Sequence, residues 1–225
     1  MIKIKIILIL SLFLVKSALF AQKGQFSIGF MAGSLFYEFD NTRYVSFSQN
    51  FNYTVGLYIK KNISFKQNIV SIKTGYFIDT KCYDIAFSDT LLYNSKNKND
   101  SFVYGNIPLI IDYSYAINDR YYPFISAGFI FGHILKEVRQ TMKNDGTVEN
   151  GFPFDSENLQ NPIDFYVSIG LNYGISKQFL LRFEPYLTYQ INNGGYNNQD
   201  VNGMLAYGFK LGVQFDFIFQ KHKGK

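Results

Sequence analysis

Residues 205–219 read LAYGFKLGVQFDFIF, and apolar side chains recur at every second position along this stretch. The apolar set is Leu205, Tyr207, Phe209, Leu211, Val213, Phe215, Phe217 and Phe219, and the alternate set is Ala206, Gly208, Lys210, Gly212, Gln214 and Asp216. Successive side chains of a β-strand point to opposite faces. The stretch therefore predicts a long strand with one apolar face and one face of small, polar and charged side chains.

The same alternation recurs upstream, at residues 25–37, 51–60, 68–80, 103–117, 121–135, 163–175 and 178–191. Each segment is long enough for the roughly 9–11 residues that a tilted transmembrane strand requires. The connections at about 38–50, 81–102, 136–162 and 192–203 are long, whereas those at 61–67, 118–120 and 176–177 are short. Short turns at one end and long loops at the other are typical of outer-membrane barrels. We therefore predict an all-β fold, an eight-stranded antiparallel up-and-down transmembrane β-barrel, over residues 22–219.

Two features indicate which face of the predicted sheet is the outer one. The apolar face is too aromatic to fit inside an eight-stranded barrel, whose interior has room for little more than its own side chains. The opposite face is rich in glycine, which suits a cramped and curved interior. We therefore place the apolar face against lipid. The alternative is a soluble periplasmic carrier of the lipocalin type, in which the apolar face would line a pocket for a hydrophobic ligand.

The chain ends predict export. Residues 1–21 resemble a signal peptide, with Lys3 and Lys5 before an apolar run at 6–15 and a cleavage site near Ala21. This predicts a location in the outer membrane of a Gram-negative cell. Of 22 basic residues, three lie in residues 1–21 and three in a basic tail at 220–225, which leaves 16 against 17 acidic ones over 22–219. The barrel therefore has no basic face, and we expect no nucleic-acid partner.

The predicted inner face carries charges of both signs in equal number. They are Lys60, Lys73, Arg182 and Lys210, with Asp79, Asp112, Glu184 and Asp216. Charges shielded from water need partners, so we expect these eight residues to form a lumen charge network. Antiparallel pairing across 192–203 would set Glu184 close to Lys210. Such a network can act as a structural plug or line a proton or ion path, and the narrow bore favours the plug.

Tyrosines are expected to form the aromatic girdles that flank the lipid-facing band of such barrels, because the chain has no Trp. The set expected near the long-loop end is Tyr37, Tyr53, Tyr104, Tyr189 and Tyr207, and the set near the short-turn end is Tyr115, Tyr121 and Tyr122.

Two neighbouring segments resemble the PorT-type outer-membrane β-barrel family. They are IPLIIDY at 107–113 and YPFISAG at 122–128, and the Ala21-Gln22 pair and the closing GFKLGVQFDFIF at 208–219 fit the same group. Asp112 stands where a basic residue is common in that family. The resemblance implies an eight-stranded outer-membrane barrel, and one member of the family is linked to a secretion system.

Catalytic chemistry has little support in the sequence. The only histidines are His133 and His222, and Cys82 is the only cysteine, so no intramolecular disulfide and no cysteine-cluster metal site are expected. Candidate partners of His133 are the acidic residues and serines Ser126, Glu137, Asp145, Glu149, Asp155, Ser156 and Glu157. Their spacings match neither a nucleophile elbow nor a His-Glu metal motif. We therefore expect no enzyme activity and no catalytic, cofactor-binding or metal-binding residues. A rim enzyme acting through His133 is the weaker alternative.

The sequence thus predicts an outer-membrane barrel with a structural or interaction role and no open pore. Its partners would be outer-membrane lipid and other envelope proteins, the latter reached through the loop at 136–162 with Phe152, Pro153 and Phe154. Loops are where rigid scaffolds commonly carry function. The alternative is an accessory component or narrow channel of an outer-membrane secretion or uptake assembly.

Overall fold

The computed structural model describes residues 25–38, 45–49, 51–87, 95–143, 145–150, 161–192 and 205–217. Its strands are β1 (Gln25–Glu38), β2 (Val45–Gln49), β3 (Asn52–Phe65), β4 (Asn68–Phe87), β5 (Ser95–Tyr115), β6 (Tyr121–Lys143), β7 (Val148–Asn150), β8 (Ile163–Gly174), β9 (Phe179–Gln190) and β10 (Leu205–Phe217). The signal peptide expected at 1–21 and the tail expected at 220–225 lie outside the described residues.

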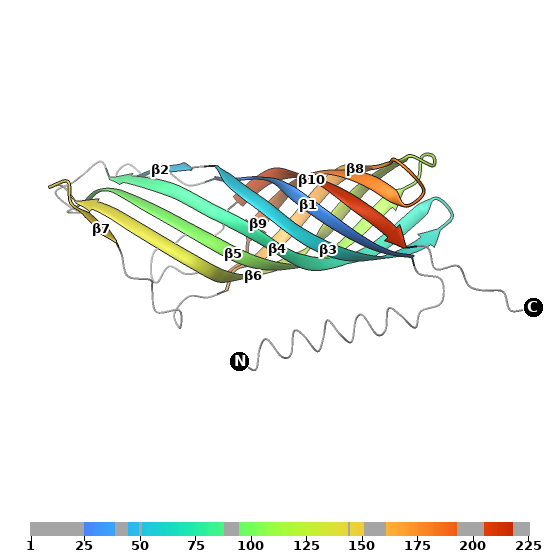
Figure 1. Cartoon of the computed structure of the whole chain (residues 1–225), viewed down its shortest axis with the longest axis horizontal. Coiled ribbons are helices and arrows are strands. Elements are labelled where there is room, and N and C mark those ends of the chain that lie inside the picture. Colours follow the sequence, from blue (N-terminus) through green and yellow to red (C-terminus); the bar gives the residue numbers. More distant parts are fainter. Residues whose placement is uncertain are drawn as a thin grey trace, which may run out of the picture.

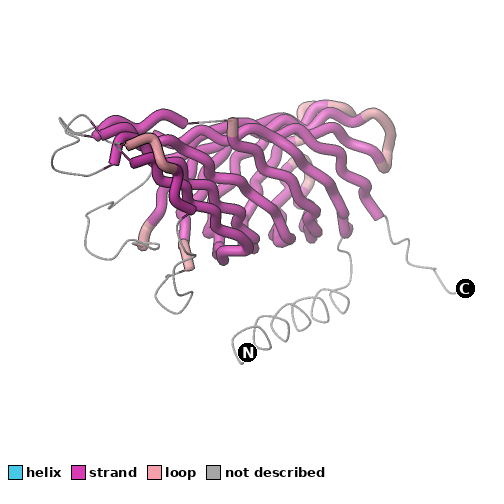
Figure 2. Tube along the Cα trace, turned by 60° about the vertical axis from the view of Figure 1, so that its left-hand side comes forward, coloured by secondary structure: helices cyan, strands magenta, loops and turns pink. Residues whose placement is uncertain are grey.

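Eight of these strands close into an antiparallel β-barrel (Figures 1 and 2). The ring runs β1, β3, β4, β5, β6, β8, β9 and β10, and β10 pairs with β1 to complete it. This is the predicted fold, with strand bounds within a few residues of those expected at the short-turn end. Within the described ranges, no helix is long and apolar enough to cross a membrane.

Three strands are longer than the sequence pattern predicts. β4, β5 and β6 continue past the other strands, so much of the connections expected at 81–102 and 136–162 is paired sheet. The short strands β2 and β7 flank this extension by pairing with β4 and β6 (left-hand end of Figure 1). The expectation of open loops was wrong here because the extension alternates weakly and its polar residues resemble a loop. Residues 151–160 of the expected loop lie outside the described residues.

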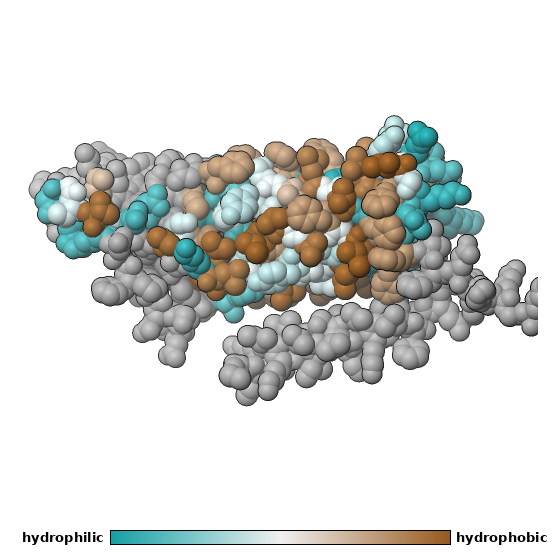
Figure 3. Space-filling view, in the orientation of Figure 1, coloured by the Kyte–Doolittle hydropathy of each residue, from teal (hydrophilic) through white to brown (hydrophobic). Residues whose placement is uncertain are grey.

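The outer surface of the barrel is apolar and the inner one is polar. Outward side chains such as Leu57 (61% exposed), Ile111 (58%) and Ile169 (63%) face away from the protein. Apolar residues gather over the barrel wall in Figure 3, and hydrophilic ones gather on the turns at its right-hand end and on the extension at its left. Among the described residues, buried polar and charged side chains outnumber buried hydrophobic ones by 21 to 12. This arrangement is the reverse of a soluble carrier's and disfavours the lipocalin-like alternative.

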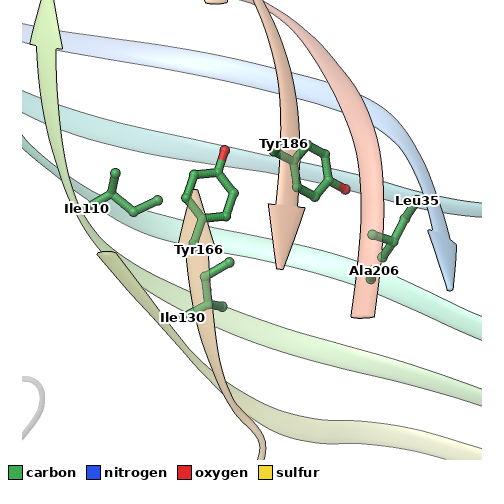
Figure 4. Close-up of a cluster of buried hydrophobic side chains, with 6 residues drawn as sticks. All are labelled: Leu35, Ile110, Ile130, Tyr166, Tyr186 and Ala206. Carbon is green, nitrogen blue, oxygen red and sulfur yellow. The ribbon is translucent and has the colours of Figure 1, made fainter. Parts of the chain in front are cut away.

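The interior also contains large aromatic rings, which the sequence pattern did not indicate. Tyr166 and Tyr186 stack with ring centroids 5.6 Å apart and pack with Leu35, Ile130 and their neighbours (Figure 4). Two tyrosines expected in the outer girdle, Tyr37 and Tyr104, instead line the inner surface near the long-connection end. Their alternation places them on the inner face of β1 and β5, so the girdle assignment was wrong for both. The outward tyrosines of the expected girdles are Tyr53, Tyr115, Tyr121, Tyr189 and Tyr207.

Glycine permits close approach of neighbouring strands at several positions of the inner face, of which Gly33 and Gly75 are examples. A Cβ at Gly33 would collide with the Phe209 carbonyl oxygen and lie 2.8 Å from the Lys210 Cα. A Cβ at Gly75 would meet the Leu57 carbonyl oxygen and lie 2.7 Å from the Tyr58 Cα. The obstacles are backbone atoms, which cannot rotate away. The strands can therefore come this close at such positions because glycine has no side chain.

Candidate functional site

A cluster of five charged side chains fills the bore toward the short-turn end. Lys60 of β3, Lys73 of β4 and Asp112 of β5 come from one side of the ring, and Arg182 and Glu184 come from β9 on the other. Strand alternation points all five inward, because chain neighbours such as Ile59, Ile111 and Phe183 point outward. The Asp112 and Glu184 side chains have no exposure to solvent.

Lys73 bridges the two carboxylates of this cluster. Its Nζ lies 3.1 Å from a carboxylate oxygen of Glu184 and 3.6 Å from one of Asp112. Lys60 Nζ lies 3.2 Å from the second oxygen of Asp112. Lys60 and Lys73 are direct neighbours across β3 and β4, a like-charge arrangement that is unfavourable on its own. The two carboxylates between them offset this repulsion.

Arg182 forms the second bridge. Its Nε lies 2.7 Å from Glu184 Oε2, and its Nη1 lies 3.1 Å from Asp112 Oδ2. The guanidinium group also lies over the Phe124 ring, 3.6 Å from its centroid. Arginine suits this position because its planar fork of donors can satisfy two acceptors while its face stacks on an aromatic ring.

Hydroxyl groups complete the coordination of both carboxylates. Tyr166 and Ser168 donate to Glu184 Oε1 over 2.7 and 2.8 Å, and Ser126 donates to Asp112 Oδ1 over 2.7 Å. A buried ion pair is tolerated only when such hydrogen bonds satisfy its remaining polar atoms. Glu184 meets that condition, whereas Asp112 Oδ2 has ion pairs with Lys60 and Arg182 but no hydrogen bond. The three cations and two anions of the cluster leave a single positive charge.

The cluster connects opposite walls of the barrel. β9 stands directly opposite β4, so the contact between Lys73 and Glu184 spans the full bore. Two small cavities lie beyond it toward the long-connection end. The inner one, of about 10 Å³, is lined in part by Lys73, Glu184 and Lys210, and is barely large enough for one water molecule.

The remaining residues of the expected charge network lie apart from this cluster. Lys210 is the cross-strand neighbour of Glu184, as the expected register requires. Its ammonium group, however, lies over the Tyr186 ring, 4.1 Å from the centroid. Asp79 accepts a 2.6 Å hydrogen bond from Asn106, and Asp216 accepts one of the same length from Gln214.

Two inward charges were not counted in the expected network, namely Lys81 and Asp164. Lys81 is buried beyond Asp79 on β4, in a stretch that the sequence pattern assigns to a loop. Asp164 is half-buried at the start of β8. Its inward orientation could be predicted, because the period-two pattern of this strand points the next residue, Phe165, outward. Both line the larger cavity of about 40 Å³ at the long-connection end. They have opposite signs, so the inner face of the described barrel wall remains balanced at five charges of each sign.

His133 lies on the outer surface, where its Nε2 is 3.2 Å from the Tyr76 hydroxyl. The candidate nucleophile Ser126 is inside the barrel and hydrogen-bonded to Asp112, so the wall separates it from His133. Ser156, Asp155 and Glu157 lie outside the described residues. Within the part of the chain that the structure describes, no group of three His, Cys, Asp or Glu side chains could hold a metal ion.

The fold defines a class of protein, the closed eight-stranded antiparallel barrel, and several solved structures resemble it. They include Neisserial surface protein A (12% identity, TM-score 0.47, covering 87% of this chain and 100% of that one). The outer membrane protein OprG from Pseudomonas aeruginosa has 13% identity and a TM-score of 0.48, covering 88% and 98%. Ail, the attachment invasion locus protein of Yersinia pestis, has 13% identity and a TM-score of 0.39, covering 86% and 97%. No protein-family model and no curated protein sequence matches the chain. At such low identity, the similarity concerns fold alone.

Proposed function

We propose that the protein is an integral outer-membrane barrel with a structural or interaction role, without an open pore and without enzyme activity. The observation that carries the proposal is the charge cluster across the bore, with Lys73 on one wall paired to Glu184 on the opposite wall. An ion pathway would need a continuous polar route for ions, whereas this cluster fills the cross-section of the bore with charged side chains that are already paired with one another.

The apolar exterior supports the membrane location. Exposed apolar side chains follow the barrel strands all round the ring, and a soluble monomer rarely exposes so much continuous apolar surface. The resemblance of residues 107–113 and 122–128 to PorT-type barrels and the expected signal peptide at 1–21 point the same way. Fractionation with SDS gels of unboiled and boiled samples tests the location. We expect the protein in the outer-membrane fraction with a mobility shift on boiling, and a soluble protein without a shift would contradict it.

Conductance in planar bilayers tests the closed bore. The wild-type barrel should give no steady current. The double variant Lys73→Ser, Glu184→Ser removes one link across the bore and should conduct more than a matched control with Lys66→Ser, Gln67→Ser in an exposed turn. Steady, ion-selective current through the wild-type protein would instead favour the alternative role, a narrow channel or accessory part of a secretion or uptake assembly.

The sheet extension is the surface that we propose for partners in the cell envelope. Val138 and Met142 of β6 and Val148 of β7 are exposed there, and Met142 pairs directly with Val148. Photo-crosslinkers placed at Val138 and Val148 in living cells should give adducts with another envelope protein. A crosslinker at Ile125, on the apolar wall, is the matched control and should give none. Equal adducts at all three positions would contradict a specific surface.

A further inference from the structure

The charged side chains at the two ends of the barrel interior differ in whether they form ion pairs. Toward the short-turn end, the five cluster residues make ion pairs of 2.7–3.6 Å. Toward the long-connection end lie four more charges, Asp79, Lys81, Asp164 and Lys210. Among the described residues, none of these four has an ion-pair partner within 4.0 Å. They surround the cavity of about 40 Å³ instead.

The two lysines present donors to this cavity without acceptors. Lys81 is 9% exposed and Lys210 7% exposed, so each is more than nine-tenths buried. Their ammonium groups lie over aromatic rings, 5.0 Å from the Tyr37 centroid and 4.1 Å from the Tyr186 centroid. No described residue offers either Nζ a hydrogen-bond acceptor. A ring face attracts a cation, but it accepts no hydrogen bond of ordinary strength from the ammonium group, so the N–H donors of both lysines remain available to a ligand or water in the cavity.

The two carboxylates at this cavity, those of Asp79 and Asp164, have few hydrogen-bond donors. Asp79 uses one oxygen to accept from Asn106, and its other oxygen is buried without a hydrogen bond, next to Thr54, its cross-strand neighbour on β3. Asp164 is within electrostatic range of both Lys81 and Asp79. No described donor hydrogen-bonds its carboxylate. Buried polar atoms without partners are unfavourable, so donors and acceptors are both missing at this site.

The cavity lies at the long-connection end of the described strands. Its lining includes Tyr37 near the end of β1, Asp164 at the start of β8 and Gln190 at the end of β9, all at the long-connection end of their strands. A volume of about 40 Å³ accommodates roughly three water molecules or a small charged group, because one water needs about 10–15 Å³. The four charges sum to zero, so a neutral ligand that carries both signs preserves the balance.

From this juxtaposition of unsatisfied donors and acceptors, we propose that the cavity is a binding site for the zwitterionic end of a small amino acid. The carboxylate of the ligand accepts from Lys81 and Lys210, and its ammonium group donates to Asp79 and Asp164. The remainder of the ligand points toward the long-connection end of the strands. The site gives the barrel a binding function in addition to its proposed structural role, and it requires no passage through the bore.

Calorimetric titration of the refolded protein in detergent micelles with glycine tests this proposal. Acetate and methylammonium, which each carry one of the two charges, serve as matched ligands at the same ionic strength. We expect saturable binding of glycine and binding at least tenfold weaker for each single-charge ion, since one charge-assisted hydrogen bond lost corresponds to about a tenfold change or more. Wild-type protein alone decides this comparison, so no variant has to fold.

Two variants then locate the site. Lys81→Met and Asp164→Asn should each weaken glycine binding about tenfold or more, whereas Lys66→Met in the exposed turn at the opposite end should leave it unchanged. A boiling-dependent gel shift verifies that each variant is folded. Acetate binding as tightly as glycine would overturn the zwitterion assignment in favour of an anion site. No saturable binding by folded wild-type protein would overturn the site and leave the four charges bridged by water.

Discussion

Lys73 Nζ and Glu184 Oε1 lie 3.1 Å apart although their strands, β4 and β9, stand opposite each other in the ring. Most contacts in a small barrel join adjacent strands, but this one joins opposite walls. Arg182, beside Glu184 on β9, makes a parallel link to Asp112 on β5. The barrel is therefore braced internally by two ionic links in addition to its backbone hydrogen bonds.

Glu184→Gln should destabilise the folded barrel by about 3–5 kcal/mol, because it leaves Lys73 and Arg182 as buried cations short of a counter-charge. A double-mutant cycle of Glu184→Gln with Lys73→Met, read by urea unfolding, should show a coupling of about 0.5–3 kcal/mol. The same cycle with Lys210→Met is the control. It should couple less, because Lys210 neighbours Glu184 in register but lies over aromatic rings. Stronger coupling to Lys210 would contradict the observed pairing.

Leu211→Arg should destabilise the barrel in a lipid bilayer, because Leu211 is 56% exposed on the apolar wall near the middle of β10. An arginine facing the middle of a bilayer costs about 2–4 kcal/mol. Ile175→Arg is the matched control, since Ile175 is 61% exposed but lies in the turn between β8 and β9. Unfolding titrations in vesicles should show a large loss for the first and little for the second. Equal losses would argue that Leu211 does not face lipid.

Gly33→Ala should lower stability by about 1–3 kcal/mol, the usual range for overpacking. The added methyl group would meet the Phe209 carbonyl oxygen, which belongs to the neighbouring strand and cannot rotate away. Gly174→Ala is the comparison, because its nearest obstacle is the Asp119 carbonyl oxygen at 3.2 Å, in a turn that can yield slightly. Refolding yield and urea midpoint measure both variants. A Gly33→Ala barrel as stable as wild type would show that the wall is less tightly bent there.

The turn at residues 145–147 should depend on pH. Hydrogen bonds from the Thr147 hydroxyl and backbone N–H lower the pKa of Asp145 below its usual value. Gly146 supports the turn with a φ of 83°, a conformation that favours glycine. Because the folded pKa is depressed, the stabilisation is present above the usual carboxyl pKa and is lost as pH falls through the folded pKa. The amide shift of Thr147 by NMR should follow this titration in wild type. In Asp145→Ala it should not, and an unchanged titration there would assign the effect to another group.

The barrel itself could be predicted from the sequence, because the alternation of apolar and polar residues that specifies its strands is a local pattern. Outward residues such as Leu211 and inward ones such as Lys210 alternate along one strand, and a period of two is visible without any knowledge of the fold. The inward orientation of Lys60, Lys73, Asp112, Arg182 and Glu184 follows from the same period, so the members of the central cluster could be named.

The pairing of those charges could not be predicted, because it depends on which strands face each other. Register places Glu184 beside Lys210, but the shape of the bore brings it to Lys73 on the opposite wall. Large inward rings such as Tyr166 fill the space that would allow other arrangements. The inward position of Lys81 could not be predicted, because the extension of β4 past the barrel lacks the strong alternation of the wall.

The ionic links across the bore also constrain how the barrel assembles. Lys60, Lys73 and Asp112 are synthesised well before Arg182 and Glu184, so a shorter chain lacks the ion-pair partners that β9 supplies. A chain that has not yet placed β9 leaves Lys73 without the Glu184 carboxylate and Asp112 without the Arg182 guanidinium group. Closure of the ring and completion of these ion pairs are therefore one cooperative step, and a stalled or truncated chain gains only part of the stability that the finished cluster provides.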